Sequence, residues 1–467
     1  MANRSDNIVA EEARAIEVGE ETGATGGRRR DTWATHTGFI LACVGSAVGM
    51  ANIWLFPYRV AQLGGAAFLI PYLIFVALLG FTGVIGEMSF GRAMGTGPMG
   101  AFGKAMEMRG VRNGNRIGKI IGLVPTLGSL ALAIGYAVVL GWACHYLFSA
   151  LTGELMAQTD TSAFFGAMAS DFGNVTFHLL GLAVTFGIMI LGVSRGIEKA
   201  NKVLMPTFFV LFVIIAIRVA TLPGAEAGYM YLLVPRWEAL LNPTTWVYAL
   251  GQAFFSLSLA GCGTLVYGSY LKKDVDVVDA AKNVAIFDTI AGLVAACVVV
   301  PAVFAFGLDV SSGPPLLFIT LAQVFQEMPF GGVFAIILFV AVVFAAITSL
   351  MNLFEAPVEA LQGQLGLSRV VSVGIVAVAA VAVGLFIEGG SAVSDWMDVI
   401  SIYVIPVGAF LAAVMFFWVC PAGFAKQQAG LGRAKPLGKW FNFMTRYVFV
   451  GITAVVIVLG IFYGGIG

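Results

Sequence analysis

The residues from Gly45 to Pro57 carry the first pattern that could do chemistry, because they interrupt a long apolar segment. The stretch reads Gly-Ser-Ala-Val-Gly-Met-Ala-Asn-Ile-Trp-Leu-Phe-Pro, inside an apolar run at about 38–63. A membrane helix is normally a uniform apolar run of about 20 residues. Backbone without helical hydrogen bonds is tolerated at membrane depth only where it lines a cavity or is buried in protein. We therefore expect this helix to unwind near its centre, and its free backbone groups to bind a small ligand.

A second interruption lies between Gly251 and Gly263, where Ser256 and Ser258 are followed by small residues. Serines and glycines at this spacing weaken the interior of a helix. Two interrupted segments at corresponding positions of two halves indicate a transporter built from inverted repeats, with its binding site at the middle of the membrane.

The composition is that of a polytopic membrane protein. Of the 467 residues, 59% are hydrophobic and 11% are charged, whereas soluble domains carry roughly 25% charged residues. The formal net charge of zero indicates no nucleic-acid partner. The five cysteines lie in apolar segments without paired spacing, which argues against a disulfide framework or a metal cluster.

We predict an all-α membrane protein with about eleven transmembrane helices. The apolar runs lie at about 38–63, 66–90, 121–150, 176–194, 203–221, 244–271, 284–307, 331–361, 370–387, 396–420 and 444–464. Loops rich in Lys and Arg alternate with loops that have few, and the loop at 151–175 is acidic without a basic residue. The positive-inside rule then places the N-terminus in the cytoplasm.

These spans divide the chain into four expected parts. Residues 1–32 are polar and lack the apolar core of a signal peptide, so they are predicted to be a flexible cytoplasmic tail. Residues 33–221 would form the first five-helix repeat and 222–421 the second, with external loops. Residues 422–467 would form a cytoplasmic loop and the eleventh helix. Helices 1 and 6 open the two repeats, and these are the two helices predicted to unwind at the midplane.

The chain resembles the neurotransmitter:sodium symporter family in several motifs that occur in the same order over about 30–420. They are Trp33-Ala34-Thr35, the stretch 45–57, Gly64–Tyr72, Gly86-Glu87-Met88, Asn242-Pro243, Phe254–Ser258, Tyr267–Tyr270 with Lys273-Asp274, and Ala345–Ser349. The number of spans, eleven rather than twelve, is similar to that of the prokaryotic branch, which carries amino acids. The resemblance implies a sodium-coupled symporter of the bacterial inner membrane that imports an amino acid by alternating access, with membrane lipid around it and without an organic cofactor.

The resemblance also implies two sodium sites, and sodium is a hard cation that prefers oxygen ligands. One site would use the Ala47 carbonyl, the Asn52 amide oxygen, Ser256 and Asp288. The second would use the carbonyls of Gly45, Val48 and Ala345 with the hydroxyls of Thr348 and Ser349. The residues alone leave other interpretations open. The two hydroxyls could bond back to their own helix, and Gly45 with Gly49 could be a helix-packing pair.

Asp288 departs from the family, because most members have Asn at the matching position of span 7. A carboxylate in a membrane span is costly and indicates a function. Relatives that need chloride hold that ion beside this sodium site. Asp288 is therefore predicted to supply the negative charge itself and to make transport chloride-independent. The alternative is a solvated Asp at the cytoplasmic end of the helix.

The substrate site implied by the resemblance is built from the same two breaks. The carboxylate of a zwitterion would meet N–H groups near Met50 and Ala51 together with Tyr136. Its ammonium group would meet carbonyls near Ala47, Phe255 and Ser256 and the hydroxyl of Ser258. The side-chain pocket would consist of Leu132, Phe255, Gly261, Ser349 and Leu353. Small residues at 260 and 261 leave room for a hydrophobic or aromatic substrate, unless Met50 or Cys262 refills the space.

Further residues match positions that gate or support this site. Arg30 and Trp33 resemble an N-terminal latch, with Tyr270 beside it, and Asp398 resembles the acidic half of an external ion pair. Glu87 is expected to bond the unwound part of span 1, and Gln252 is expected to support Ser256.

Three further positions differ from the family pattern. Leu55 replaces the Arg that would pair with Asp398, and Arg59 is either its substitute or a plain surface residue. Gly363 replaces the acidic partner of Arg30, with Glu359 as a possible substitute. Ala51 replaces a Gly and crowds the carboxylate pocket, so a non-α-amino-acid zwitterion or an amine is the alternative substrate.

Other functional classes find less support. A channel would need a filter or rings of pore charges, and no such repeat is present. The sequence has no His-Glu-x-x-His or Gly-x-Ser-x-Gly motif, and its three histidines are scattered, so we do not expect an enzyme. A non-transporting substrate sensor on the same scaffold stays open.

Overall fold

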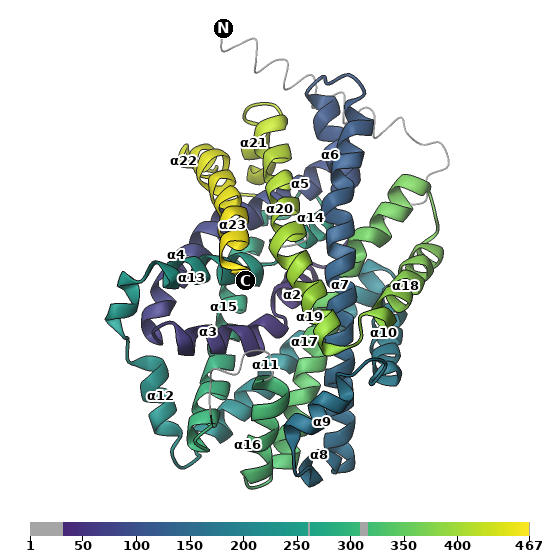
Figure 1. The fold of residues 1–467 in the computed structure, drawn as a ribbon. Helices are drawn as coiled ribbons and strands as arrows, with labels where there is room; N and C mark the ends of the chain where they lie inside the picture. The colour runs from purple at the N-terminus through teal and green to yellow at the C-terminus, as the bar shows by residue number, and fades with distance from the viewer. Residues whose placement is uncertain (1–30, 260–261, 309–315, 467) are drawn as a thin grey trace.

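The computed structural model describes residues 31–259, 262–308 and 316–466, and helix is the regular secondary structure throughout these ranges (Figure 1). The first elements are α2 (His36–Ala47), η1 (Ala51–Leu55), α3 (Phe56–Gln62), α4 (Ala66–Leu79), η2 (Gly80–Val84), α5 (Ile85–Met94), α6 (Pro98–Met108), α7 (Gly114–Thr152), α8 (Glu154–Ala157), α9 (Thr161–Met168), α10 (Val175–Ile190), η3 (Val193–Glu198) and α11 (Lys199–Ala220). Arg30 and Gly261, both predicted to act at the site, lie outside the described residues.

The chain continues with elements that include the second predicted break. They are α12 (Ala225–Leu233), η4 (Trp237–Leu241), α13 (Pro243–Ser256), α14 (Gly263–Gly268), α15 (Val277–Ala305), η5 (Leu316–Thr320), α16 (Leu321–Glu327), α17 (Gly331–Leu365), α18 (Arg369–Phe386), α19 (Gly390–Val399), η6 (Ile400–Val404), α20 (Ile405–Val414), η7 (Met415–Val419), α21 (Phe424–Gly430), α22 (Trp440–Phe443), η8 (Met444–Phe449) and α23 (Val450–Tyr463).

The predicted all-α membrane class is confirmed. Within the described ranges, eight helices are long and apolar enough to cross a membrane, and a ninth is obtained when the bent pair at 36–62 is taken as one span. Val175–Ile190 is a shorter apolar helix. The count of about eleven spans and the division into two repeats stay predictions.

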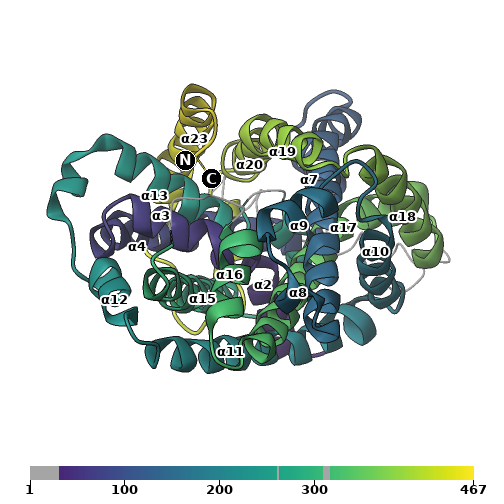
Figure 2. The same ribbon diagram turned by 60° about the horizontal axis from the view of Figure 1, so that its bottom comes forward.

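The broken helices lie inside the bundle, and the short helices lie at its two ends. Figure 2 shows α2 near the middle, with α11, α15 and α17 around it, and all three contact it. In Figure 1, α6, α21 and α22 lie at one end, and α8, α9, α12 and α16 lie at the other. The basic segments at 104–119 and 426–439 therefore lie at one end and the acidic 154–171 segment lies at the other, the separation that the positive-inside rule describes.

The first predicted break is confirmed. Regular α-helix ends at Ala47, Val48 has an extended ψ of 99°, and the two halves of the span are bent by 56°. Two of the freed N–H groups find side-chain partners: Gly49 donates to the Asn52 amide oxygen at 3.1 Å and Met50 donates to the Tyr136 hydroxyl at 2.7 Å. The break therefore satisfies its own backbone without water, as a membrane interior requires.

The second predicted break is confirmed as well. Helix α13 ends at Ser256 and α14 begins at Gly263. Ser258 and Cys262 both have a φ of 55°, in the left-handed region that non-glycine residues rarely adopt. Such a conformation costs about 1–2 kcal/mol per residue. It persists where the surrounding structure determines it, commonly at functional sites.

Glycines bring α14 directly against α5. A Cβ added at Gly91 would lie 1.9 Å from the Leu265 carbonyl oxygen and 2.8 Å from the Ser269 nitrogen. A Cβ at Gly268 would lie 2.5 Å from the Met88 carbonyl oxygen. The two backbones are therefore in contact, and this contact fixes the position of the second half of the broken span.

We predict that Gly91→Ala destabilises the protein by about 1–3 kcal/mol, because the new methyl group would meet backbone atoms that cannot rotate away. Gly187→Ala is the matched control, since Gly187 is an exposed helical glycine with no atom within 4 Å of an added Cβ. The measurement is thermal unfolding of the detergent-purified variants. Equal melting temperatures for the two variants would contradict the contact.

Candidate functional site

Three of the predicted site residues meet around one carboxylate. The Asn52 side-chain nitrogen donates to Asp288 Oδ1 at 2.7 Å, and the Ser256 hydroxyl donates to Asp288 Oδ2 at 2.6 Å. Asn52 also lies 3.3 Å from the Ser256 hydroxyl. The three side chains come from η1, α13 and α15, so this cluster joins both broken spans to span 7.

The solvated interpretation of Asp288 is wrong. Its side chain is fully buried, Asn52 and Ser256 are buried beside it, and the Tyr72 hydroxyl lies close to the same carboxylate. All three of these neighbours are neutral. A buried carboxylate with neutral partners is a strong attractor for a cation, because an unpaired charge is costly in a medium of low dielectric constant. Ser256 and Asp288 thus place the oxygens that a hard cation prefers at this point, whereas Asn52 presents its amide nitrogen to Asp288 and its predicted ligand oxygen accepts from the Gly49 N–H.

The second predicted set of oxygens also comes together. The Ser349 hydroxyl donates to the Gly45 carbonyl at 3.2 Å and lies 3.4 Å from the Val48 carbonyl. These contacts connect α17 to the end of α2. Thr348 behaves differently, since its hydroxyl bonds back to the carbonyls of Phe344 and Ala345 at 3.1 and 3.0 Å. The back-bonding interpretation thus holds for Thr348 but not for Ser349.

Tyr136 lies at the first break, as predicted. Its hydroxyl accepts from the Met50 N–H, and a Cβ at Gly49 would lie 2.8 Å from that hydroxyl and 3.0 Å from the Ser349 hydroxyl. Ala51 follows directly and is half-buried. The Met50 N–H and the Tyr136 hydroxyl bond to each other here, and both are donors of the kind that a carboxylate takes.

Ser258 joins the two breaks. Its hydroxyl donates to the Ser46 carbonyl at 2.8 Å, and the two serine hydroxyls lie 3.2 Å apart. Ser258 therefore has its left-handed backbone conformation at the point where its side chain contacts span 1. Ala47, one residue further along, is buried at the end of α2.

The predicted side-chain pocket is assembled in part. Leu132 and Phe255 pack against Ile400 and Ile405 together with Trp396, so Phe255 contacts span 10. Ser349 and Leu353 are buried on α17, and the Leu353 carbonyl accepts from Ser129 on α7 at 2.8 Å. The contribution of Gly261 lies outside the residues that the structure describes.

Trp33 holds the start of span 1 against the second half of span 6. The Trp33 indole donates to the Tyr267 carbonyl at 3.0 Å, and its ring lies 5.1 Å from the Tyr267 ring. The Tyr270 hydroxyl donates to Glu355 at 2.7 Å. Arg369 then binds both oxygens of Glu355, at 2.8 Å each.

Sequence reasoning missed Glu355 as the centre of this network. The prediction that Glu359 substitutes for the acidic partner of Arg30 stays a prediction, because Arg30 lies outside the described residues; Glu359 itself accepts from Thr96 at 2.9 Å. The signal was present, because Glu355 is a carboxylate in the middle of a long apolar run and Arg369 begins the next helix.

The expected partner of Glu87 is corrected. Glu87 was predicted to bond the unwound part of span 1, but it accepts from the Thr264 hydroxyl and the Leu265 N–H on α14. The reason is the close packing of α5 on α14, which places Glu87 beside the first turn of α14. Glu87 thus supports the broken span 6, because the N–H groups at the start of α14 need acceptors.

The expected role of Gln252 is also corrected. Both of its amide atoms are buried without a hydrogen-bond partner in the described part of the chain. No bond reaches Ser256, because the Ser256 hydroxyl is already engaged by Asp288 and Asn52.

The external ion pair has no equivalent among the described residues. Asp398 is exposed. The Arg59 guanidinium lies 3.9 Å from the centre of the Tyr248 ring, so it stacks on α13. Arg59 is half-buried and is therefore neither a substitute partner for Asp398 nor a plain surface residue.

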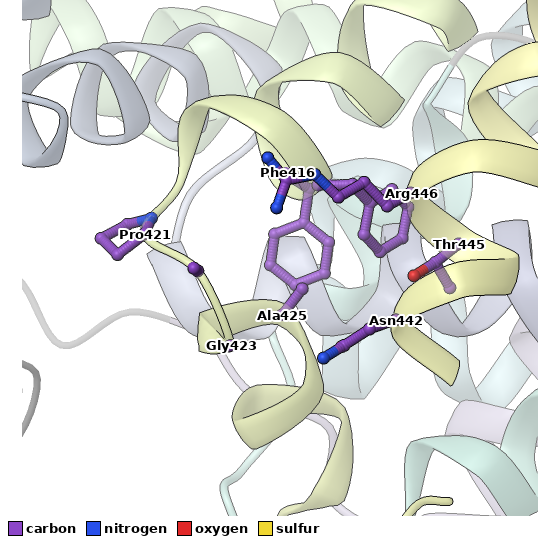
Figure 3. A pocket seen from close by; sticks show the side chains of 9 residues that line it. Phe416, Pro421, Gly423, Ala425, Asn442, Thr445 and Arg446 are labelled. Carbon is purple, nitrogen blue, oxygen red and sulfur yellow. The ribbon is translucent and has the colours of Figure 1, made fainter. Parts of the chain in front are cut away.

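A small cavity of about 90 Å³ lies away from both breaks, near the loop after span 10. Figure 3 shows Phe416, Asn442, Thr445 and Arg446 around it, and none of the predicted site residues lines it. It therefore has no part in the candidate site.

Comparisons with known proteins identify a family of sodium-dependent transporters. The profile of the sodium:neurotransmitter symporter family matches residues 30–165 and 159–463. An uncharacterized sodium-dependent transporter of Bacillus subtilis is 34% identical over 69% of this chain and 70% of the relative. A second one, from Methanocaldococcus jannaschii, is 30% identical over 91% and 90%. The crystal structure of MhsT in complex with L-phenylalanine matches with a TM-score of 0.82 and 32% identity, over 92% of this chain and all of that one.

We predict that Arg369→Met destabilises the protein by about 3–5 kcal/mol, because it leaves the fully buried Glu355 without its cation. The double variant Arg369→Met with Glu355→Leu should regain much of that loss. Arg433→Met is the matched control, since its pair with Asp276 is partly exposed and worth less than about 1 kcal/mol. Thermal unfolding in detergent measures all three. A double variant no more stable than Arg369→Met would contradict the prediction.

Proposed function

The chain belongs to the sodium:neurotransmitter symporter family and is a sodium-dependent transporter, and we propose that it imports a hydrophobic or aromatic amino acid without needing chloride. The observation that carries this proposal is the cluster of Asn52, Ser256 and Asp288, which joins the breaks of spans 1 and 6 around one buried carboxylate. MhsT, which is similar over its whole length, has been crystallised with L-phenylalanine.

The two breaks suit the two ends of a zwitterion. The substrate carboxylate would bind the Met50 N–H and the Tyr136 hydroxyl, which already lie 2.7 Å apart. The ammonium group would bind carbonyls at the ends of α2 and α13 near Ser258. Leu132, Phe255 and Leu353 would surround the side chain, and their apolar character favours a hydrophobic substrate.

Two sodium ions are proposed at the two oxygen clusters. The first would lie between Ala47, Asn52, Ser256 and Asp288, and the second between Gly45, Val48, Ala345, Thr348 and Ser349. Each cluster takes oxygens from span 1 and from a different neighbouring helix, so a bound ion ties those elements together. Binding would favour the conformation in which both clusters are complete, and alternating access follows from this shift in populations.

Chloride independence follows from the charge of Asp288. A sodium ion beside a carboxylate forms a neutral pair, whereas sodium beside an Asn leaves a net positive charge in a medium of low dielectric constant. An external anion would have to balance that charge. Because Asp288 is fully buried among neutral partners, the balancing charge is part of this chain.

Ala51 favours one alternative substrate class. Its half-buried methyl group stands next to the Met50 N–H that would receive the carboxylate. A substrate with its carboxylate displaced, or with none, would avoid the methyl group. A non-α-amino acid or an amine is therefore the second candidate.

The test is uptake into proteoliposomes with a panel of labelled substrates. The panel holds aromatic, branched, small and acidic L-amino acids, one non-α-amino acid and one primary amine. We expect aromatic or branched amino acids to accumulate only under an inward sodium gradient. Accumulation without sodium would overturn the proposal. Binding without accumulation would show a sensor, and preference for the amine would confirm the second candidate.

A matched pair of tyrosines on α7 supplies the control for this experiment. Tyr136→Phe removes the hydroxyl that contacts Met50 and should raise the half-saturating substrate concentration about 10-fold or more. Tyr146→Phe removes a hydroxyl that has no partner in the described structure and should leave that concentration unchanged.

We predict that initial uptake rates are equal in sodium chloride and sodium gluconate. Asp288→Asn should raise the half-saturating sodium concentration about 10-fold or more, because a charged ligand is lost. Asp279→Asn, at an exposed position in the first turn of the same helix, is the control and should have no effect. Strong chloride dependence of the unmutated protein would exclude the assigned role of Asp288.

A further inference from the structure

Asn201 is a polar side chain in a helix that crosses the membrane, and no part of the proposed mechanism uses it. It lies on α11 and is fully buried. Its side-chain nitrogen donates to the Ile197 carbonyl of its own helix at 2.8 Å. Its side-chain oxygen is buried without a hydrogen-bond partner among the described residues. A buried amide oxygen left unpaired costs about 1–3 kcal/mol, so its presence calls for an explanation.

The bond to Ile197 fixes which way the amide points. Only the NH₂ group can donate to a carbonyl, so the oxygen must face away from α11. It faces Gly45: a Cβ built on Gly45 would lie 2.2 Å from the Asn201 oxygen. The same Cβ would lie 3.0 Å from the Cβ of Thr348, so Asn201 and Thr348 border the same side of Gly45.

The polar groups around this point offer oxygens but no spare proton. The Ser349 hydroxyl donates to Gly45, and the Thr348 hydroxyl donates to carbonyls of its own helix. The carbonyls of Gly45 and Val48 can only accept. A group of acceptors without a donor is stabilised by a cation, and neutral oxygens of this kind suit a hard monovalent ion.

We infer that the Asn201 amide oxygen is an additional ligand of the second sodium ion, contributed by α11. This inference rests on the proposed function and adds a residue to the second of its two ion sites. The bound ion would then connect α11 with α2 and α17. Residue 45 would also have to be glycine, because any Cβ would displace the Asn201 oxygen.

The experiment compares sodium dependence across three variants in proteoliposomes. Asn201→Ala removes the oxygen and should raise the half-saturating sodium concentration about 10-fold. Substrate affinity at saturating sodium should stay unchanged. Asn201→Asp keeps an oxygen and adds charge, so it should lower the half-saturating sodium concentration at high pH and lose that gain as the pH falls. Asn283→Ala is the matched control, since Asn283 makes the same bond to the carbonyl four residues earlier, at a half-buried position of α15.

Sodium binding by the purified variants, followed as the rise in melting temperature with sodium, gives a second readout where transport is lost. A purely structural Asn201 would lower the melting temperature of Asn201→Ala without changing its sodium dependence, and this result would overturn the inference. If the unmutated protein binds sodium normally and both Asn201 variants match it, the inference alone fails. If the unmutated protein shows no sodium dependence, the proposed function fails with it.

Discussion

The structure depends on how the backbone groups freed at two breaks find partners where lipid offers none. Span 1 uses Asn52 and Tyr136 as partners for two of its N–H groups. Span 6 uses Ser258, whose hydroxyl reaches back to the carbonyl of Ser46. Tyr136 of α7 and Ser258 of span 6 thus satisfy groups freed in span 1, so span 1 could not unwind without these neighbours unless it buried unpaired groups. The binding site is a consequence of this requirement, since the polar groups gathered to complete the breaks are also the groups that contact a ligand.

Carboxylates hold the helix starts on either side of these breaks. Glu198 accepts from the Ala34 N–H and the Thr35 hydroxyl at 2.7 Å each, directly before α2 begins. Glu87 accepts from Thr264 and Leu265 at the start of α14. A negative group at a helix start complements both the free N–H groups and the helix dipole. The first half of span 1 and the second half of span 6 are therefore each attached by one acid, to the end of η3 and to α5 respectively. When either half moves during transport, these contacts must either break or move with it.

The sequence predicted the breaks because their cause is local. Gly45, Gly49 and Pro57 are poor helix residues in a run that is otherwise apolar, and Ser256 and Ser258 repeat the signal. Partners across the bundle were harder, because they depend on which helices touch. Glu87 was expected to bond span 1. Its position in the sequence of span 2 gives no sign of the glycine contact between α5 and α14, which places Glu87 beside α14. Gln252 was assigned to Ser256 by spacing along one helix, whereas Asp288 from another helix occupies that hydroxyl.

Asp288 shows how one buried charge can couple an ion to a conformation. Asn52 and Ser256 donate hydrogen bonds to it and the Tyr72 hydroxyl lies nearby, but none of these three neighbours balances its charge. A carboxylate in such surroundings raises the free energy of any state that holds it without a cation, and lowers the free energy of sodium binding by the same electrostatic interaction. Asn52 belongs to the broken span 1 and Ser256 to the broken span 6, so the ion that neutralises Asp288 also favours the arrangement in which both breaks face it. On the proposed function, sodium binding at Asp288 is the step that couples the sodium gradient to the conformational change. The binding site then needs no charged side chain for the substrate. The substrate carboxylate meets only N–H and hydroxyl donors, beside a sodium ion whose charge Asp288 already balances.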